Sequence, residues 1–515
     1  MATAYRECYR HNSLRRGKAA SRPAQLGTRC RTMSAFGIPV SLAVLQPFND
    51  QSIQVESIVA VGCPPWLTFN KDIADGSPVS AHEDAVLLRL GPDREGDTRI
   101  VARIPMLPSS AGYVGRGTHT LEGIARQACE LAAGEVLFLS PAQVLSEMIV
   151  RHVDDFSFRA VVILLSKNSS ETRDVWKLQR ILFDLGLVGI GSIQIGDCEA
   201  RCFLNSKRVR SLDSLGGWSR GRVAMSSLGN NGRFANQLFQ YAYVKFYALR
   251  HGLTAAIPAW DGNQLFGLED PSCVGLNLPE LSFGPFSEDD LALWKVDEPP
   301  VDIDLRGYFQ EIPECWQKHR QLLGRMFQLS AEHRHAIEDW RVDVTQAGRR
   351  TLVAVHIRRG DYRYYQNWKW PWFRLVPEDW YIAWLRAIWP QLRDPLLFVA
   401  TDEPKAILPL FREFETTSVI FGPTMRSIPD HVRDFEILRR ADYLAICNSS
   451  FSRMAAILAS STQKCFCPSF QTHSFVPYEP WMDRHFWSRF ATRSARLRRW
   501  ASSIKTRLLK AMRRK

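Results

Sequence analysis

The segment 353–361 joins an apolar run to one imidazole, two guanidinium groups and a carboxylate. These groups belong to His356, Arg358, Arg359 and Asp361. An apolar run of this length before a glycine-containing turn predicts a buried strand of a parallel sheet. Ligands of such sheets bind at the carboxyl ends of the strands, where each guanidinium can offer two parallel N–H donors to phosphate oxygens. We therefore predict an anion site here, and a structural ion-pair network is the alternative.

A glycine-rich turn leads into a second element within the segment 228–242. Gly232 and Arg233 stand in the turn, and the apolar residues after them recur on one helical face. A helix that begins in this way exposes free backbone N–H groups, which favour an anionic ligand. The amide of Asn236 could hydrogen-bond such a ligand, or it could cap the helix, as asparagine does well.

A third polar stretch follows the apolar run 443–447. It places Ser450, Phe451 and Ser452 where a strand is predicted to end and a helix to begin. Hydroxyl groups at a helix N-terminus suit a phosphate. Serine is also a frequent helix cap, and the two roles are compatible.

These stretches need a framework of about two or three domains, since 515 residues exceed one small domain. Apolar runs alternate with amphipathic ones between residues 51 and 215, which predicts an α/β domain of unknown function. A serine- and glycine-rich boundary precedes a second α/β region, which we divide into 216–345 and 346–482. The ends are predicted to be a basic, disordered extension at 1–50 and a basic amphipathic tail at 483–515.

The positive charge lies at the two ends of the chain. Of the formal net charge of +13, residues 484–515 contribute +12 and residues 1–33 contribute +7, which leaves −6 for the body. A nucleic-acid-binding core is therefore not indicated, and the tail is predicted to lie on an anionic membrane surface or to pack on its own domain. No apolar run approaches the roughly 20 residues of a membrane span. Without a secretory signal pattern or a cysteine framework for metal, we expect a cytoplasmic protein with reduced thiols.

Taken together, the stretches 232–242, 356–361 and 448–452 resemble glycosyltransferase family 11, the α1,2-fucosyltransferase-like enzymes. They occur in the family's order, and the resemblance covers about residues 224–481. The chain departs from the family in having Ala235 where glycine is common and Arg453 where many members have tryptophan. A methyl group at Ala235 could crowd a close approach that glycine permits.

The resemblance implies a GT-B-like pair of facing Rossmann-like domains, preceded here by the extra α/β domain. It also implies an inverting, metal-independent enzyme that moves fucose from GDP-fucose to a glycan hydroxyl without a cofactor. Arg358 would clamp the β-phosphate of the departing GDP, where negative charge develops. The other donor-binding residues implied by the match are His356, Arg359, Asp361, Asn236, Gly232, Arg233, Ser450, Phe451 and Ser452.

The sequence leaves the proton acceptor open. Inverting transfer calls for a group that takes the proton of the acceptor hydroxyl. The candidate acids or bases are Asp361, Asp402, Asp434 and Glu436. The pair Asp302 and Asp304 offers a divalent metal site as an alternative, although such pairs are frequent by chance.

The expected partners are a GDP-sugar donor and a glycan or lipid-linked saccharide acceptor. We expect the basic tail to hold the enzyme at the cytoplasmic face of the membrane, where bacterial surface polysaccharide is assembled. Two alternatives remain open at this point. The chain could be a non-catalytic nucleotide-sugar or glycan-binding protein, or a transferase that uses another GDP-sugar.

Overall fold

The computed structural model describes most of the chain from residue 172 to residue 483. Gaps lie at 196–197, 213–214, 217, 285–288, 297, 366–372 and 416–422. Before residue 172 the structure describes seven strand segments between residues 57 and 166. After residue 483 it describes residues 486–490. The predicted extension at 1–50 and the tail beyond residue 490 lie outside the described residues.

A seven-stranded mixed sheet forms the first unit. Its order is β5-β4-β1-β6-β7-β9-β8, and β1, β6 and β7 run parallel at its centre. The strands are β1 (Ser57–Val61), β4 (Asp84–Arg89), β5 (Arg99–Pro105), β6 (Val136–Leu139), β7 (Ala160–Ser166), β8 (Leu187–Ile195) and β9 (Cys198–Asn205), with a separate pair β2 (Thr68–Phe69) and β3 (Val79–Ser80). Helix α5 (Thr172–Asp184) connects β7 to β8.

A four-stranded parallel sheet forms the second unit, in the order β11-β10-β13-β12. Its strands are β10 (Arg222–Ala224), β11 (Thr254–Ala256), β12 (Glu280–Ser282) and β13 (Ile303–Arg306). The helices of this part are α6 (Phe234–His251), α7 (Asp261–Phe266), α8 (Asp289–Leu293), the 3-10 helix η3 (Glu314–His319), α9 (Arg320–Met326) and α10 (Ala331–Val344). Helix α6 is the crossover between the parallel strands β10 and β11, as such a connection requires.

A five-stranded sheet forms the third unit, in the order β15-β14-β16-β17-β18, with only the edge strand β18 antiparallel. Its strands are β14 (Thr351–Ile357), β15 (Pro395–Thr401), β16 (Tyr443–Ala445), β17 (Lys464–Ser469) and β18 (Ser474–Pro477). Its helices are α11 (Tyr362–Tyr365), α12 (Glu378–Ile388), η5 (Trp389–Gln391), α13 (Pro404–Ile407), η6 (Leu408–Phe411), α14 (Pro423–Ser427), α15 (Asp430–Arg440), α16 (Ser450–Leu458) and η7 (Phe486–Phe490). The predicted α/β class, with parallel sheets, is confirmed.

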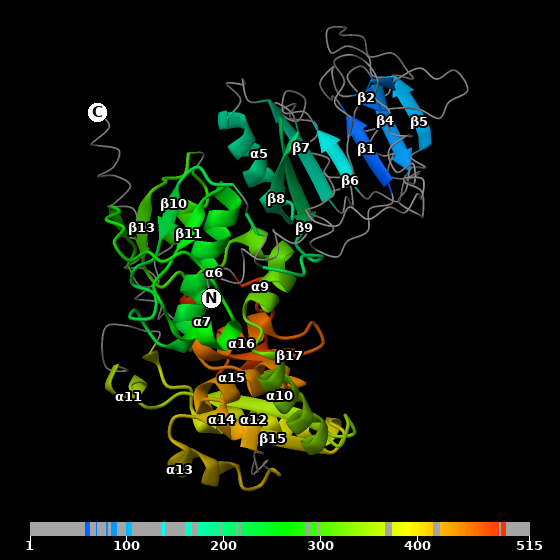
Figure 1. The fold of residues 1–515 in the computed structure, drawn as a ribbon. Coiled ribbons are helices and arrows are strands. Elements are labelled where there is room, and N and C mark those ends of the chain that lie inside the picture. The colour runs from blue at the N-terminus through cyan, green and yellow to red at the C-terminus, as the bar shows by residue number, and fades with distance from the viewer. Residues whose placement is uncertain are drawn as a thin grey trace, which may run out of the picture.

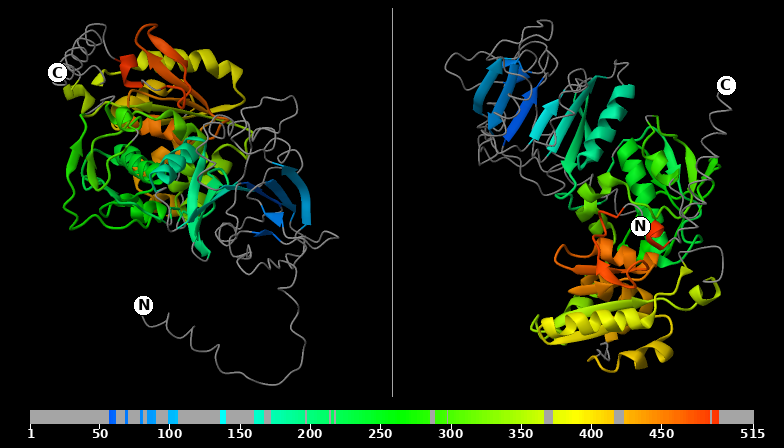
Figure 2. Two further views of the ribbon diagram at one scale, coloured as in Figure 1. Left: turned by 90° about the horizontal axis from the view of Figure 1, so that it is seen from above. Right: turned by 180° about the vertical axis from the view of Figure 1, so that it is seen from behind.

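The three sheets follow one another along the molecule, as the views in Figures 1 and 2 agree. Helix α6 of the second unit packs on α16 of the third. Phe486 and Phe490, at the start of the predicted tail, are buried in the core with Tyr478 and Phe470 around them. No helix in the described part of the chain is long and apolar enough to cross a membrane.

Strand β14 is buried on both faces, as a parallel strand covered by helices must be. Its side chains alternate between two hydrophobic clusters. Val353 and Val355 face the cluster that includes α12, whereas Leu352 and Ala354 face the larger cluster on the side of α15 and α16. His356 is the next position on that second face, so the two-residue period of the strand carries its imidazole toward α16.

The first and second units share one packed interface around α5 and α6. The side chain of Gln179 donates to the Leu249 carbonyl over 2.8 Å and accepts from the Trp218 indole over 2.8 Å. Arg250, which is buried, pairs with Asp184 at 2.6 Å. One hydrophobic cluster continues across the boundary that we predicted at residue 215.

We expect Gly252→Ala to destabilise this interface strongly. Gly252 ends α6 with a φ of 61°, and an added Cβ would lie 2.3 Å from the Trp176 ring. Gly267 ends α7 with a φ of 64° and has no neighbour within 4 Å of its would-be Cβ, so Gly267→Ala measures the backbone strain alone. In urea denaturation we expect losses of about 1 kcal/mol at Gly267 and about 3 kcal/mol at Gly252. Equal losses would contradict a tight contact with Trp176.

Candidate active site

A cavity of about 920 Å³ lies between the second and third units. One wall comes from the N-terminus of α6, from α7 and from the segment after β13. The other wall comes from the ends of β14 and β15, from α11 and α15, and from the N-terminus of α16. The lining brings together most of the residues predicted from sequence, namely Gly232, Arg233, Asn236, His356, Arg358, Asp361, Asp402, Asp434, Ser450 and Phe451. The three predicted stretches therefore meet in one place.

Arg358 leaves the carboxyl end of β14 and is held between two carboxylates. Its Nη2 and Nε atoms lie 2.5 Å and 3.1 Å from Asp361 Oδ1, and its Nη1 atom lies 2.9 Å from Asp402 Oδ2. Asp402 directly follows β15, the parallel neighbour of β14, so the two strand ends present the pair together. Burial by itself lowers the pKa of Arg358, but Asp402 and Asp361 outweigh it, and the net pKa is raised. The guanidinium is thus a fixed, permanently charged donor in the cavity.

An ion pair connects the two walls of the cavity. Asp361 also accepts from the Nη2 atom of Arg233 over 3.0 Å, and Arg233 belongs to the opposite wall, at the start of α6. The Arg233 side chain is 69% exposed, so this contact lies in solvent. The charges of the arginine-rich loop are therefore paired with each other, and Arg358 also lines the cavity.

The imidazole of His356 is a neutral group of the cavity. Its Nδ1 atom lies 3.2 Å from Cys447 Sγ, and its ring centroid lies 5.1 Å from that of Phe451. Burial, reinforced by Arg358, lowers the pKa of His356 to about 3. His356 can therefore serve a ligand by hydrogen bonding or ring contact at neutral pH, but it adds no positive charge.

Arg359, which we expected at the donor, does not line the cavity. Its guanidinium turns into the protein, where it pairs with Glu378 at 2.7 Å and donates to the Val376 carbonyl over 2.7 Å. The backbone of Arg359 is also fixed, because its N–H donates to the Asp402 carboxylate over 2.8 Å. Arg359 thus fixes the loop that presents its neighbour.

Ser452 and Glu436 also lie outside the cavity lining. Ser452 is fully buried, and its hydroxyl accepts from the N–H of Cys447 over 3.3 Å. Glu436 is buried on the core side of α15, where it pairs with Arg439 and Arg440. Two residues along a helix turn a side chain by about 200°, so Glu436 lies on the face of α15 opposite its cavity-facing neighbour Asp434.

Asn236 is not the cap of α6. The N-cap is Arg233, and Asn236 lies within the first turn, where its Oδ1 accepts from Nε2 of Gln310. Gly232 has a φ of 87°, and a Cβ there would come within 2.5 Å of the Asn236 amide. A glycine is therefore required at position 232, and the neighbouring Ala235 is accommodated as a buried residue.

Asp434 differs from the other three predicted acid or base candidates, which are ion-paired. It lines the cavity from α15, is half-buried, and forms no hydrogen bond or ion pair with the described residues. Burial raises the pKa of Asp434 to about 6, with Arg433 opposing this effect and Asp430 adding to it. Its carboxylate is thus able to accept a hydrogen bond from a ligand.

The Asp302 and Asp304 pair does not reach the cavity. Asp302 accepts from the N–H of Arg222 over 2.9 Å, and Asp304 accepts from the N–H of Ser226 over 2.9 Å. Both carboxylates therefore hold loops around β10. Among the residues that the structure describes, no three histidine, cysteine or acidic side chains gather as a metal site would require.

Several lining residues were not singled out as site residues from the sequence. They include Asp261, Tyr308, Gln310, Tyr365, Phe373, His431 and Trp487. The segment 307–310 carries a weaker resemblance to the α1,2-fucosyltransferase-like enzymes, and this signal could have found Tyr308 and Gln310. The sequence holds no signal for Trp487, because a tryptophan in a basic stretch belongs to no known binding motif.

No protein-family model matches the chain. Galactoside 2-alpha-L-fucosyltransferase SEC1 of Bos taurus is 23% identical over 262 residues, covering 47% of this chain and 66% of the relative. Galactoside alpha-(1,2)-fucosyltransferase 2 of Hylobates lar is 28% identical over 244 residues, covering 44% of this chain and 67% of the relative. The chain is similar to α1,2-fucosyltransferases. It spans about two thirds of the length of these curated relatives, and the similarity supports a glycosyltransferase.

Solved structures of fucosyltransferases also align with part of the chain. NodZ alpha-1,6-fucosyltransferase soaked with GDP-fucose aligns with a TM-score of 0.36 at 16% identity, over 50% of this chain and 99% of NodZ. A mutant FUT1 of Arabidopsis thaliana in complex with GDP aligns with a TM-score of 0.34 at 12% identity, over 49% of this chain and 71% of FUT1.

Proposed function

We propose that this fucosyltransferase-like protein is an inverting, metal-independent enzyme that moves fucose from GDP-fucose to a hydroxyl of a glycan acceptor. The observation that carries the proposal is the position of Arg358, a fixed guanidinium at the carboxyl end of β14 inside a cavity between two parallel-sheet units. Similarity to galactoside fucosyltransferases supports fucose as the transferred sugar, and it makes a galactoside the first acceptor to test.

In the proposed reaction the acceptor oxygen bonds to the anomeric carbon of fucose while the bond from that carbon to the β-phosphate oxygen breaks. The acceptor hydroxyl gives its proton to the carboxylate of Asp434. The electron pair of the broken bond leaves on GDP, and the N–H groups of Arg358 stabilise it there. When GDP-fucose binds, phosphate oxygens would replace one of the two carboxylates that pair with Arg358. Asp361 suits this exchange, because Arg233 still offers it a cation. Such an exchange needs no metal ion to neutralise the leaving group.

We place the reaction at the cytoplasmic face of a bacterial membrane, on a precursor of surface polysaccharide. The +12 charge of residues 484–515 supports attachment to anionic lipid. Deleting residues 491–515 should release the protein from vesicles of anionic lipid in co-sedimentation, whereas neutral vesicles should retain neither form. Equal binding of both forms to anionic vesicles would exclude this role for the tail.

The direct experiment mixes purified protein with GDP-fucose and lactose in the presence of EDTA. Release of GDP, together with a fucosylated product of inverted anomeric configuration by NMR, is the expected result. GDP binding in calorimetry without turnover would favour the non-catalytic alternative. Turnover of a different GDP-sugar alone would favour the alternative donor.

Replacing Asp434 by asparagine should lower transfer by about a hundredfold and change its pH dependence. The wild-type rate should rise as pH increases through about 6, because only the ionised carboxylate of Asp434 can take the proton of the acceptor hydroxyl. The variant should lose that rise. Asp339→Asn, which alters an exposed aspartate on α10, is the matched control and should keep the wild-type profile. A wild-type profile without a step near pH 6 would contradict this role for Asp434.

A further inference from the structure

A buried amide of the cavity wall has an unused hydrogen-bond acceptor. Gln310 is 5% exposed and lines the cavity, and its Nε2 donates to Asn236 Oδ1. The Oε1 atom of Gln310 is buried and has no hydrogen-bond partner among the described residues. Buried polar atoms are almost always paired, so an unpaired one on a residue that lines a cavity points to a ligand.

Asn236 adds a donor next to that acceptor. Its Oδ1 is occupied by Gln310, while its Nδ2 forms no hydrogen bond with the described residues. The two amides therefore present one N–H donor and one carbonyl acceptor side by side. If both amide groups are rotated by half a turn, the free carbonyl oxygen lies on Asn236 and the free N–H group on Gln310, so the pair still offers one donor and one acceptor.

The backbone of Gln310 is held from the opposite unit. Arg453 of α16 is fully buried and donates from Nη1 to the Gln310 carbonyl over 2.6 Å. Its guanidinium lies 4.6 Å from the ring centre of Phe486 and 5.7 Å from that of Phe239. The arginine that replaces the tryptophan common in similar enzymes is thus a positioning residue, which fixes the amide pair relative to the N-terminus of α16.

We propose that Gln310 and Asn236 bind neighbouring hydroxyl groups of a neutral acceptor saccharide. This assigns Asn236 to the acceptor, and not to the donor as the resemblance implied. Uncharged amides suit hydroxyl groups, each of which can both donate and accept. The pair lies on the second unit's wall, whereas the proposed clamp for the donor phosphates, Arg358, lies on the third unit's wall. Tyr308, two residues before Gln310, also lines the cavity and offers a ring face for the sugar. This inference rests on the proposed function, since it names the acceptor class of the same cavity.

The test uses saccharide binding and does not depend on turnover. A panel of methyl glycosides of galactose, glucose and N-acetylglucosamine is titrated by saturation-transfer NMR into the full chain with saturating GDP. Gln310→Met keeps the side-chain volume and removes both polar atoms, and it should weaken saccharide binding about tenfold or more. The affinity for GDP should not change. Gln328→Met, at an exposed glutamine, is the matched control and should bind as the wild type does.

A second measurement guards against a folding defect in the variant. Among monodeoxy analogues of the glycoside that binds best, the wild type should lose affinity for at least one about tenfold. Gln310→Met should not discriminate that analogue from its parent. No saccharide binding by the wild type, equal binding by Gln310→Met, or a change in GDP affinity alone would each overturn the inference. Failure of the wild type to bind GDP would instead overturn the proposed function.

Discussion

Arg358→Ala is expected to reduce transfer from GDP-fucose by about a thousandfold or more, because the leaving GDP loses its fixed cation. The substitution also leaves Asp361 and Asp402 facing the cavity without the guanidinium that lies between them. These two carboxylates, of which only Asp361 keeps a cation in Arg233, would repel the diphosphate, so GDP affinity should fall together with the rate. Arg358→Lys keeps the charge but cannot place two parallel donors, and it should show an intermediate loss.

Arg386→Ala is the matched control for this experiment. Arg386 also pairs with a carboxylate, Glu413 at 2.8 Å, but its side chain is 65% exposed and lies outside the cavity lining. Its loss should leave both the rate and GDP affinity unchanged. Measurements of kcat/KM for the donor and of the Kd for GDP check both variants. An Arg358→Ala enzyme within tenfold of wild type would exclude the proposed clamp.

Glu436→Gln is expected to lower the free energy of unfolding by about 3–5 kcal/mol without any direct effect on ligand groups. Glu436 is buried and pairs with both Arg439 and Arg440 at the end of α15. Arg439 also donates to the Leu458 and Phe327 carbonyls, each over 2.9 Å, and so joins α15 to α16 and α9. Removing the buried carboxylate would leave two partly buried guanidinium groups without the counter-charge with which both are paired.

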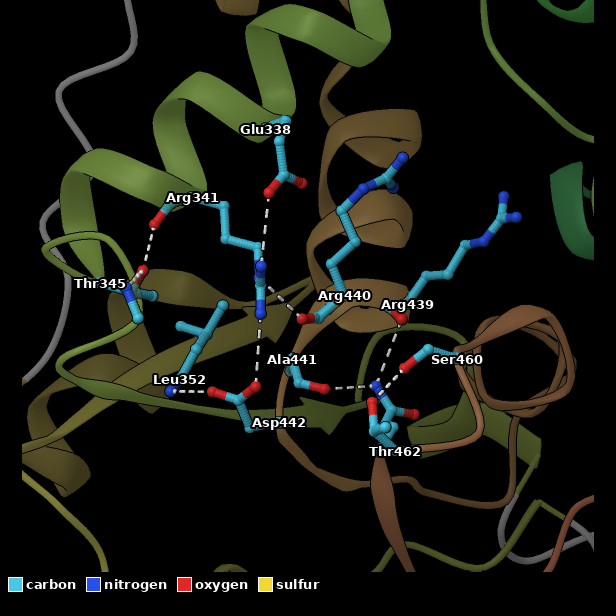
Figure 3. A network of polar contacts seen from close by, with 12 residues as sticks. Glu338, Arg341, Thr345, Leu352, Arg439, Arg440, Ala441, Asp442, Ser460 and Thr462 are labelled. Atoms are coloured by element: carbon cyan, nitrogen blue, oxygen red, sulfur yellow. Dashed lines mark hydrogen bonds and ion pairs between the residues drawn. The ribbon is translucent and has the colours of Figure 1, made fainter.

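The neighbouring contacts of α10 provide the control. Figure 3 shows Arg341 of α10 between Glu338, the Arg440 carbonyl and Asp442. The Glu338 side chain is 51% exposed, and it lies 3.4 Å from Arg341. Glu338→Gln should therefore change stability by less than about 1 kcal/mol. Urea denaturation of both variants tests the difference, and similar losses would contradict the importance of burial at Glu436.

The parallel sheet and its anion loop could be predicted from the sequence. The apolar run before Arg358 has the length of a strand buried on both faces, and the turn after it marks the carboxyl end. Parallel strands bring these ends together, which is why Arg358 and Asp402 lie side by side although 44 residues separate them. Local pattern and strand direction together were sufficient for this part of the site.

The direction of individual side chains could not be predicted in the same way. Arg358 and Arg359 are adjacent and chemically alike, yet one faces the cavity and the other pairs with Glu378 in the interior. Asp434 and Glu436 share one helix, yet they lie toward the cavity and the core respectively. Each outcome depends on what the neighbouring elements place beside the backbone.

The sequence by itself determined the α/β class and the order of the polar stretches, and it placed Arg358 at the end of a buried strand. These features follow from hydrophobic periodicity and turn residues, which act over short distances along the chain. Only the tertiary structure decided that Asp361 bridges Arg233 and Arg358, and that Arg453 holds Gln310 beside Asn236. Those contacts join segments far apart in sequence, so they exist only once the second and third units have packed around the cavity.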